Sequence, residues 1–259
     1  KTFKDELVTK DELWGFNNSL PYFSPNDQFI SFSAFRNFEQ EIMLYNTQTK
    51  KTINLTNTSI TETDPMWSQD GKYIYFTSSR LKPSYPFGIQ NARIYRLPLE
   101  NIDEPYRGDK FTELFKEEKK DTSKKVIVKT DEVINIDMDR IMDRLELVGP
   151  SFGSQAIVSL YQKGDKLTVF YSSNHSEGKP ALWKTVIEPF EENKIEKIAG
   201  TDGASSFQVI TVNDKFFLLT KGNIMKLNVE TNKIDPVNIS YTFRRNLQAE
   251  FSQMFEEAW

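Results

Sequence analysis

Apolar and aromatic residues recur along this chain in short runs separated by polar turns, and two stretches repeat one pattern. Residues 65–80 read PMWSQDGKYIYFTSSR, and residues 21–36 read PYFSPNDQFISFSAFR. The Asp-Gly signal within residues 69–71 is typical of a tight turn. The run that follows it is rich in β-branched and aromatic residues, which predicts a strand packed on both faces. The two copies start about 44 residues apart, a spacing typical of propeller blades with four strands each.

The alignment of the two stretches pairs residues of the same kind. It matches Phe23 to Trp67, Ser24 to Ser68, Ile30 to Ile74, Phe32 to Phe76 and Arg36 to Arg80. We expect Phe23 and Trp67 to pack between blades. A third, weaker copy aligns residues 166–173 with residues 72–79, which places Phe170 under Phe76.

These repeats predict an all-β fold, a β-propeller whose blades each contain four antiparallel strands. About four blades are present. We expect them to be part of a larger propeller, because roughly six to eight blades are commoner than four. The expected strands are residues 21–24, 28–34, 41–46 and 51–56 in the first blade, 65–68, 72–78, 93–97 and 143–148 in the second, 156–161, 166–173, 181–187 and 194–198 in the third, and 207–212, 215–220, 223–229 and 234–237 in the fourth.

Two insertions interrupt the second blade. The Pro and Gly residues within 81–90 predict an ordered but irregular loop. Within residues 101–125, a helix is expected to begin at 111–115, and the alternating charges of 117–125 predict a solvated, mobile loop. An arm that docks a partner is the alternative for this charged segment. The remaining local expectations are extended segments at 126–128 and 133–136, and packing of Trp14 and Phe16 at the edge of the first blade.

A helix with one apolar stripe is predicted after Arg245. Such a stripe does not stay exposed on a short isolated helix, so we expect this helix to open a following domain. The predicted division is therefore propeller blades over residues 1–242 and the truncated first helix of the next unit over residues 243–259. The apolar residues that recur at helical spacing are Leu247, Phe251, Met254 and Phe255.

Composition narrows the class of protein. Aromatic residues make up 13% of the 259 residues, enough for a buried core, and the net charge of −4 favours neither nucleic acid nor an anionic membrane as a partner. No apolar run approaches the roughly 18 residues of a membrane span, and residues 1–10 lack the apolar core of a signal peptide. With no cysteine and one histidine, thiolate catalysis and metal sites built from Cys or clustered His are excluded.

Two motifs suggest hydrolase chemistry and are set aside. Residues 149–153 (GPSFG) match the G-x-S-x-G elbow of hydrolases, in which the serine ends a strand and opens a helix. Here Pro150 precedes Ser151 and an extended run follows, so we expect a turn between blades. The single histidine, His175, falls in a hairpin loop and is expected to be solvent-exposed.

Three aspartates suggest a calcium loop and are also set aside. Asp137, Asp139 and Asp143 approximate the alternating ligands of such a loop. Met142 occupies the position at which the loop needs a glycine. We therefore expect surface charge here, and no metal or other cofactor.

Two arginines are the candidate substrate-channel residues. Arg36 and Arg80 are equivalent in the repeat, each just after the second strand of its blade, so both are expected on the same face of the propeller. Paired arginines near a channel mouth could steer the carboxylates of peptides. A structural ion pair with a neighbouring loop is the competing interpretation. No catalytic residue is assigned in this chain.

With these residues in view, the chain resembles a known family. The blades FSPNDQFISFSA…IMLYNTQTKKTINLT and WSQDGKYIYFTSSR…ARIYRLPL are similar to the propeller repeats shared by TolB and tricorn proteases. Three further segments resemble tricorn-like proteins of bacteria: LWGFNNSLPYFSP joined to FRNFEQEIMLYN, VINIDMDRIMDRLELVGP, and FRRNLQAEFSQMFEEAW after the last blade. The last resembles the helix that opens the tricorn catalytic half.

The resemblance implies a large modular serine peptidase that has two propellers, a helical segment, a PDZ-like domain and an α/β catalytic domain. This chain would be part of the second propeller, which filters short peptides and guides them to an enclosed site. The implied partners are peptide substrates, the rest of the same chain, and further copies in a homo-oligomer. The family's catalytic residues lie in the catalytic half, so none is carried over, and His175 does not match the family's catalytic histidine.

Two alternatives stay open: a TolB-like propeller that docks protein partners, and the propeller of a prolyl-oligopeptidase-like hydrolase. We expect a cytoplasmic location, or a periplasmic one if a leader precedes Lys1. An open propeller exposes unpaired strand groups at a blade edge, which predicts instability or self-association of this piece alone.

Overall fold

The computed structural model describes residues 7–10, 20–83, 89, 91–101, 133–204, 206–240, 242 and 246–258. Several expectations lie outside these residues. They are the packing of Trp14 and Phe16, most of the loop at 81–90, the helix start at 111–115, the charged segment at 117–125 and the extended piece at 126–128.

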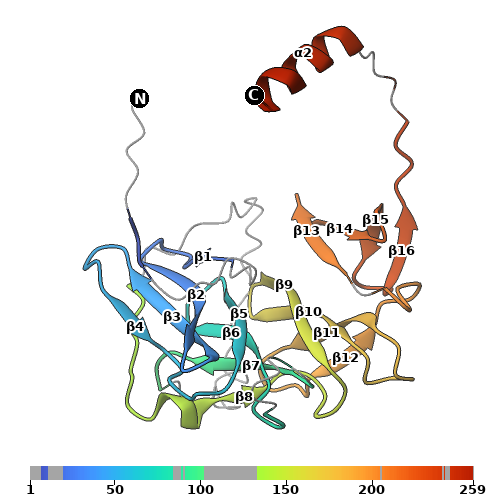
Figure 1. The fold of residues 1–259 in the computed structure, drawn as a ribbon. Helices are drawn as coiled ribbons and strands as arrows, with labels where there is room; N and C mark the ends of the chain where they lie inside the picture. The colour runs from blue at the N-terminus through green and yellow to red at the C-terminus, as the bar shows by residue number, and fades with distance from the viewer. Residues whose placement is uncertain are drawn as a thin grey trace, which may run out of the picture.

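Within the described residues, sixteen strands form four separate antiparallel sheets, each with its strands in chain order (Figure 1). The predicted all-β fold and the blades of four antiparallel strands are confirmed. Blade 1 contains β1 (Tyr22–Phe23), β2 (Phe29–Arg36), β3 (Glu39–Asn46) and β4 (Thr52–Asn54); blade 2 contains β5 (Glu62–Trp67), β6 (Tyr73–Ser78), β7 (Arg93–Pro98) and β8 (Glu146–Leu147). Blade 3 contains β9 (Gln155–Lys163), β10 (Lys166–Ser173), β11 (Ala181–Ile187) and β12 (Lys194–Lys197); blade 4 contains β13 (Gln208–Val212), β14 (Lys215–Thr220), β15 (Asn223–Asn228) and β16 (Lys233–Pro236).

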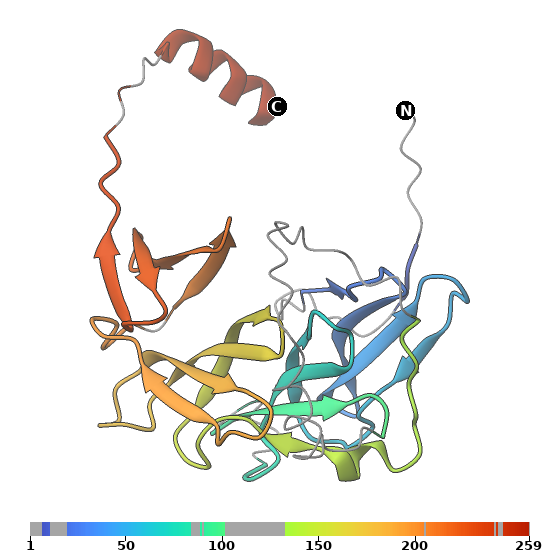
Figure 2. The same ribbon diagram turned by 180° about the vertical axis from the view of Figure 1, so that it is seen from behind.

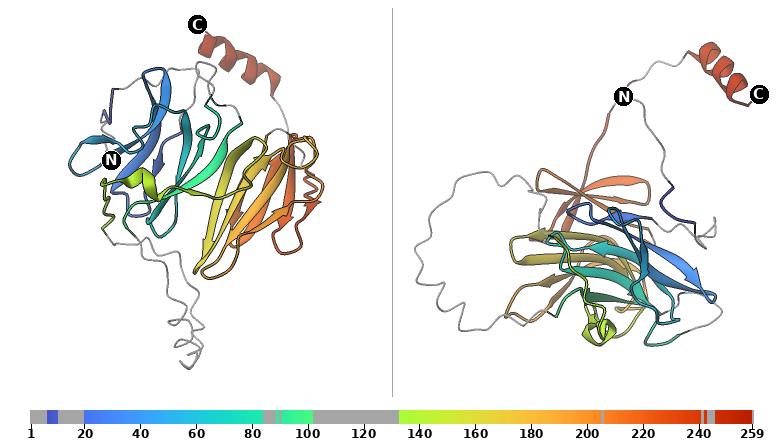
Figure 3. Two further views of the ribbon diagram at one scale, coloured as in Figure 1. Left: turned by 90° about the horizontal axis from the view of Figure 1, so that it is seen from below. Right: turned by 90° about the vertical axis from the view of Figure 1, so that its left-hand side faces the viewer.

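The four sheets follow one another like the leaves of a fan, which is clearest when the molecule is seen from below (Figure 3). The first strands of neighbouring blades contact each other: β1 with β5, β5 with β9, and β9 with β13. The first strand of each blade is therefore the innermost one. The reverse view shows the same order of sheets (Figure 2).

Alternation along each second strand decides which blade a side chain meets. In β6, Ile74 and Phe76 join the core shared with blade 1, whereas Tyr75 joins the core shared with blade 3. In β10, Tyr171 faces blade 2 and Phe170 faces blade 4. Because side chains on a strand alternate between faces, each blade supplies one half of two successive cores.

This alternation corrects one alignment made from the sequence. Phe170 does not occupy the position of Phe76, because it faces the following blade rather than the preceding one. The structural equivalent of Phe76 is Tyr171, one residue further along. A shift of one residue moves every side chain of a strand to the opposite face of the sheet. The alignment matched the Ser-Ser pairs at the ends of β6 and β10, and this placed β10 one residue out of register.

The repeat between blades 1 and 2 is borne out by identical turn chemistry. The Ser24 hydroxyl accepts a hydrogen bond from the Phe29 amide at 2.9 Å, and the equivalent Ser68 hydroxyl accepts one from the Tyr73 amide at 3.0 Å. Each serine also donates to the side chain two residues ahead, an asparagine in the first turn and Asp70 in the second. These bonds close the hairpin between the first and second strands of each blade.

The aromatic pair of the repeat behaves unequally. Trp67 is buried and stacks on Phe29 of blade 1, with ring centroids 6.1 Å apart, as expected of a residue that packs between blades. Phe23 is 59% exposed, so the expectation that it packs between blades is wrong. Both residues belong to the face that meets the preceding blade, since Phe23 pairs with Ile30 and Trp67 with Ile74. No blade precedes blade 1 among the described residues.

Two elements lie beside or beyond the sheets. A 3₁₀ helix, η1 (Ile141–Arg144), buries Ile141 against the core of blades 1 and 2 just before β8. The predicted terminal helix is present as α2 (Leu247–Ala258), which contacts no sheet and buries none of its side chains (Figures 1 and 3). The division of the chain at residue 242 stays a prediction.

Candidate functional site

The candidate site lies at the end of the blades where the second strands finish. Arg36 is the last residue of β2, and Arg80 follows the end of β6 by two residues. The strand register adds a third member: His175 follows the end of β10 by two residues, as Arg80 follows β6. Three successive blades thus present a basic or titratable side chain at the same position.

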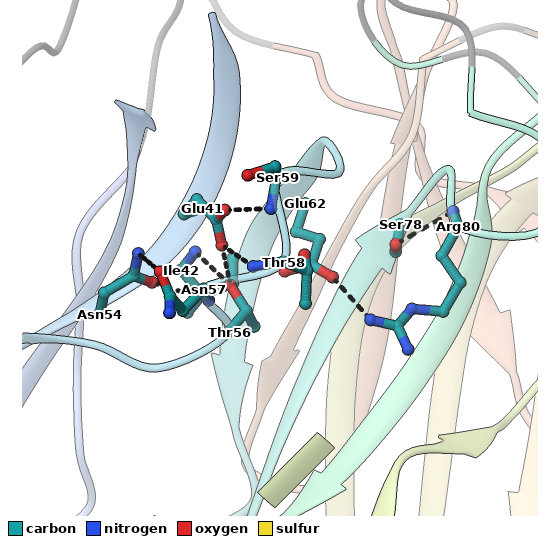
Figure 4. A network of polar contacts seen from close by, with 10 residues as sticks. All are labelled: Glu41, Ile42, Asn54, Thr56, Asn57, Thr58, Ser59, Glu62, Ser78 and Arg80. Carbon is teal, nitrogen blue, oxygen red and sulfur yellow. Dashed lines mark hydrogen bonds and ion pairs between the residues drawn. The ribbon is translucent and has the colours of Figure 1, made fainter. Parts of the chain in front are cut away.

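Arg80 forms an ion pair with Glu62, the first residue of β5 (Figure 4). The distance from Arg80 Nη2 to Glu62 Oε1 is 3.6 Å, and the Arg80 amide donates to the Ser78 hydroxyl at 3.2 Å. The Glu62 side chain is fully buried, whereas a quarter of the Arg80 side chain is exposed. The positive charge of Arg80 therefore faces the carboxyl group of Glu62 on the inner strand of its own blade. A role of Arg80 in binding peptides stays a prediction.

The environment of Glu62 favours its protonated form. Burial raises the pKa of Glu62 from 4.5 to about 7, and the neighbouring Glu41 adds to this rise, whereas Arg80 and the hydroxyls of Thr56 and Thr58 oppose it. Within the described part of the chain, no hydrogen-bond partner reaches either carboxyl oxygen of Glu62. The hydroxyl of Thr56 donates instead to Glu41 Oε2, at 2.9 Å, so its help to Glu62 is only indirect.

A second carboxylate beside Glu62 is fully satisfied. Glu41 of β3 accepts hydrogen bonds from the Thr56 hydroxyl, from the Thr58 amide at 2.9 Å and from the Ser59 amide at 2.5 Å (Figure 4). These bonds fasten the loop between blades 1 and 2 to β3. Glu41 therefore serves the structure, and Glu62 is the carboxyl group of this network that can exchange a proton near neutrality.

The position of Glu62 in blade 3 is held by an amide. Gln155 opens β9 and pairs with Ser173, as Glu62 opens β5 and pairs with Ser78. The Gln155 amide group donates to the carbonyl oxygens of Pro150, at 2.6 Å, and Phe152, and its oxygen accepts from the Ile94 amide at 3.3 Å. Gln155 thus opens the inner strand of blade 3 as a neutral side chain with satisfied hydrogen bonds, whereas Glu62 opens the inner strand of blade 2 as a titratable carboxyl group without them.

His175 is half-buried, so the expectation of a solvent-exposed histidine is not met. Its ring lies 4.0 Å from the Trp183 ring, centroid to centroid, and burial lowers its pKa. Its Nδ1 lies 2.7 Å from the hydroxyl of Ser173, a serine that is itself 1% exposed. Among the described residues no acidic side chain is found as a hydrogen-bond partner of His175, so this buried serine and the histidine do not form a catalytic triad there.

The GPSFG loop reaches the same histidine. A Cβ at Gly153 would lie 2.6 Å from the His175 backbone, and Phe152 meets the His175 ring edge-on at 5.6 Å. Ser151 lies in an exposed bend between β8 and β9, and no helix follows it. The predicted turn between blades is confirmed, and the loop does not have the strand-turn-helix form of a nucleophile elbow.

Arg36 differs from Arg80 in its contacts. Its Nη1 donates to the carbonyl oxygen of Phe35 at 2.6 Å. The residue that pairs with Arg36 across the hairpin is Glu39, whose carboxylate accepts a hydrogen bond from the Thr61 hydroxyl. Burial raises the pKa of Glu39, with Glu41 as a second cause.

A cleft of about 590 Å³ opens between blades 2 and 3 at the opposite end of the blades, where the first hairpins turn. Tyr73 and Tyr75 form one wall, and the guanidinium of Arg96 lies 5.1 Å above the Tyr73 ring. Arg96 is also bound to Glu146 at 2.5 Å. The rim carries more acidic than basic groups: Asp70, Asp165, Glu188, Glu191 and Glu192 against Lys72 and Arg96.

The described residues hold no group of acidic or histidine side chains arranged to bind a metal ion. Asp143 pairs with Arg140 at 2.6 Å, and Asp137 with Arg144 at 3.7 Å, as surface charges do. No helix in the described part of the chain has the length and apolar character to cross a membrane.

Comparisons with known proteins agree with the fold. A family model described as eukaryotic translation initiation factor eIF2A matches residues 13–89, less than half of the chain. A search of curated proteins finds no match. The tricorn protease structure is similar over 92% of this chain and 24% of its own, with 17% identity and a TM-score of 0.59.

Two further solved structures are similar at lower identity. TolB from Acinetobacter baumannii matches with 14% identity and a TM-score of 0.50, over 86% of this chain and 44% of its own. A puromycin-hydrolyzing peptidase of Mycobacterium tuberculosis matches with 12% identity and a TM-score of 0.51, over 94% of this chain and 32% of its own. This chain thus spans less than half of each structure. Together with the four sheets, these likenesses show that it forms blades of a β-propeller.

The two glutamates of this site, Glu62 and Glu41, were not predicted from the sequence. Glu62 opens β5 but lies in a polar run where no strand was expected, because a glutamate among threonines and an aspartate is typical of an exposed loop. Glu41 could have been found, since alternation within EQEIMLYN places it on the same face as the buried Met43 and Tyr45.

Proposed function

We propose that this chain is the non-catalytic propeller region of a serine peptidase and guides short peptides to a catalytic domain outside these 259 residues. The observation that carries the proposal is the cleft between blades 2 and 3. Its volume of about 590 Å³ lies within the range of ligand sites, and aromatic side chains line it beneath a polar rim. Such a surface receives the side chains of an extended peptide through contacts that tolerate many sequences.

The likeness to two peptidases supports the proposal. The tricorn protease and the puromycin-hydrolyzing peptidase are similar over nearly all of this chain, which spans only a quarter and a third of those structures. In this view the blades break no bond and need no cofactor. They exclude bulky folded substrates, and Arg36 and Arg80 draw peptide carboxylates toward one end of the propeller.

The test compares this chain with the product of the whole gene in a peptide-cleavage assay, and treats each with a serine-reactive fluorophosphonate probe. We expect cleavage and labelling of the whole product only. Labelling of this chain alone would place a nucleophile within the blades and overturn the proposal.

The cleft is tested by charge reversal in the whole product. Asp165→Lys, at the exposed rim, should change KM for peptides at constant kcat, because binding and not chemistry is altered. Glu230→Lys, in the exposed turn between β15 and β16, is the matched control and should change neither value. Equal KM values for both variants would remove the cleft from the peptide path.

A propeller that docks a protein partner is the second candidate. The match of residues 13–89 to a translation-factor family and the likeness to TolB favour it. Absence of cleavage and labelling in the product of the whole gene would make it the leading interpretation.

A further inference from the structure

The cleft between blades 2 and 3 has an apolar interior and a charged rim. Its most deeply buried lining residues are Tyr75 and Leu167, which are 2% and 6% exposed. Partly buried apolar side chains line it nearer to solvent: Tyr73, Ile187 and Phe190. A ligand group that fills this space is therefore apolar along its length and polar where it reaches the rim.

Two of the carboxylates around the cleft already have partners in the chain. Asp70 accepts a hydrogen bond from the Ser68 hydroxyl at 2.6 Å, within the first hairpin of blade 2. Glu188 forms an ion pair with Lys166 at 2.9 Å, which joins two loops of blade 3. These two carboxylates therefore hold together the hairpins that border the cleft.

Three further carboxylates at the rim form no ion pair with any described residue. Asp165 is exposed in the turn between β9 and β10, and Glu191 and Glu192 are exposed in the loop between β11 and β12. The turn and the loop are neighbours, since the ends of β10 and β11 that adjoin them are paired. The opposing charge at the rim is Lys72, so the balance at the open end of the cleft favours a cation.

The guanidinium of Arg96 shows how this cleft holds a cation. It lies 5.1 Å above the Tyr73 ring and is paired with Glu146 at 2.5 Å. An aromatic ring below a cation and a carboxylate beside it both stabilise the charge. Blade 3 supplies the same two kinds of group to the cleft, the ring of Phe190 and the carboxylates that follow it in the chain. The charge of Arg96 is offset by that of Glu146, which leaves the rim carboxylates for a second cation.

We propose that this cleft binds the Lys or Arg side chain of an extended peptide, on the basis of the proposed function that brings peptides to these blades. The aliphatic stem of such a side chain can lie along the apolar interior while its charged head meets the carboxylates of the rim. A neutral side chain of similar length leaves those carboxylates without a partner, and an acidic side chain is repelled by them.

Equilibrium binding of labelled peptides to the product of the whole gene tests the proposal. The peptides are acetylated at the N-terminus and amidated at the C-terminus, and they differ in one central residue, which is Lys, Gln or Glu. Fluorescence anisotropy, with protein treated with the fluorophosphonate probe, measures binding without cleavage. We expect the Lys peptide to bind at least about fivefold more tightly than the Gln peptide, and the Glu peptide to bind most weakly. The difference should shrink as salt is added, because the rim is exposed.

Charge reversal at the rim tests whether the preference comes from the cleft. Asp165→Lys combined with Glu192→Lys should remove the preference for the Lys peptide and favour the Glu peptide. Asp139→Lys combined with Glu230→Lys is the matched control and should keep the original preference. Both of its positions are exposed and lie outside the cleft, and the change in net charge is the same.

Equal binding of the three peptides, no binding, or a preference that the control variant also loses would overturn the assignment. A Gln peptide with a free N-terminus that binds as tightly as the acetylated Lys peptide would also overturn it, since the occupant would then be an α-amino group. Cleavage is a separate readout. A Lys preference in a whole product that cleaves no peptide would refute the proposed peptidase role and keep this binding site, and cleavage with equal binding would do the reverse.

Discussion

The Glu62 carboxylate, fully buried at the start of β5, lies 3.6 Å from the Arg80 guanidinium, and no hydrogen bond from the described residues completes the pair. The free-energy cost of removing such a carboxylate from water is larger than the favourable attraction of one partly exposed arginine. The result is a carboxyl group with a pKa of about 7 at the joint between two blades. In blade 3, Gln155 holds the same position without a charge.

The first prediction concerns the pH dependence of stability. The folded chain binds the Glu62 proton more tightly than the unfolded chain does, so stability is highest below the unfolded pKa of 4.5 and falls as pH rises to about 7. The fall amounts to about 3 kcal/mol. Glu62→Gln, which copies Gln155, should remove this fall and be more stable than the unmodified chain at pH 8. Urea unfolding at a series of pH values measures the difference.

Glu146→Gln is the control for that prediction. Glu146 also pairs with an arginine, at 2.5 Å, but its side chain is 46% exposed. Its removal should shift stability by less than about 1 kcal/mol, as for other exposed ion pairs. Parallel stability curves for Glu62→Gln and the unmodified chain would contradict the prediction.

The second prediction uses the unequal aromatic pair of the repeat. Trp67→Ala removes a buried ring that stacks on Phe29, and should lower the free energy of unfolding by about 3 kcal/mol or more. Phe23→Ala alters its repeat equivalent, which is largely exposed, and should cost less than about 1 kcal/mol. Thermal and urea unfolding of both variants measure these values. A comparable loss for the two would mean that Phe23 is covered in solution.

This pair also shows how far sequence reasoning reaches. The spacing of Ser24 and Ser68 predicted the repeat, and identical hydrogen bonds confirm it. Most strands were expected within one or two residues, because alternation and turn residues are local signals. A sequence repeat, however, predicts the position of a residue within its blade and does not predict whether another blade packs against that residue. Phe23 and Trp67 share a position, yet only Trp67 has a described blade beside it.

The candidate site was less predictable for a related reason. The equivalence of Arg36 and Arg80 followed from the alignment, but the partner of Arg80 lies 18 positions earlier in a polar segment without a distinctive pattern. The equivalence of His175 required the true register of β10, which the alignment missed by one residue. Burial of Glu62 results from the packing of two blades, and no local pattern encodes it.

The third prediction concerns the contact between the GPSFG loop and His175. Gly153 has a φ of +78°, and a Cβ there would lie 2.6 Å from the His175 backbone, so Gly153→Ala should cost about 2–4 kcal/mol. Gly164→Ala is the control, because Gly164 has a similar φ of +61° but no atom within 4 Å of the added carbon. It should cost about 1 kcal/mol.

Fluorescence adds a local readout for the third prediction. The His175 ring lies 4.0 Å from Trp183, so displacement of the histidine should change the emission of that tryptophan in Gly153→Ala and not in Gly164→Ala. Identical spectra and stabilities for the two variants would show that the loop does not press on His175.

The fourth prediction concerns the two serines near His175. Ser151 lies in an exposed bend, and Ser173 is buried with its hydroxyl 2.7 Å from His175 Nδ1. Neither has the arrangement of a catalytic nucleophile, so Ser151→Ala and Ser173→Ala should keep fluorophosphonate labelling and kcat in the product of the whole gene. Ser173→Ala should still lower stability by about 1 kcal/mol, since a buried hydrogen bond is lost.

That difference makes the two serine variants informative together. A structural role for Ser173 predicts a loss of stability with unchanged labelling, and a catalytic role predicts the reverse. If Ser151→Ala abolished labelling, the GPSFG loop would be an active-site element despite the strands on either side of it. If labelling persists in both variants, the nucleophile lies outside these blades, and the chemistry belongs to the part of the protein to which the propeller would deliver its peptides.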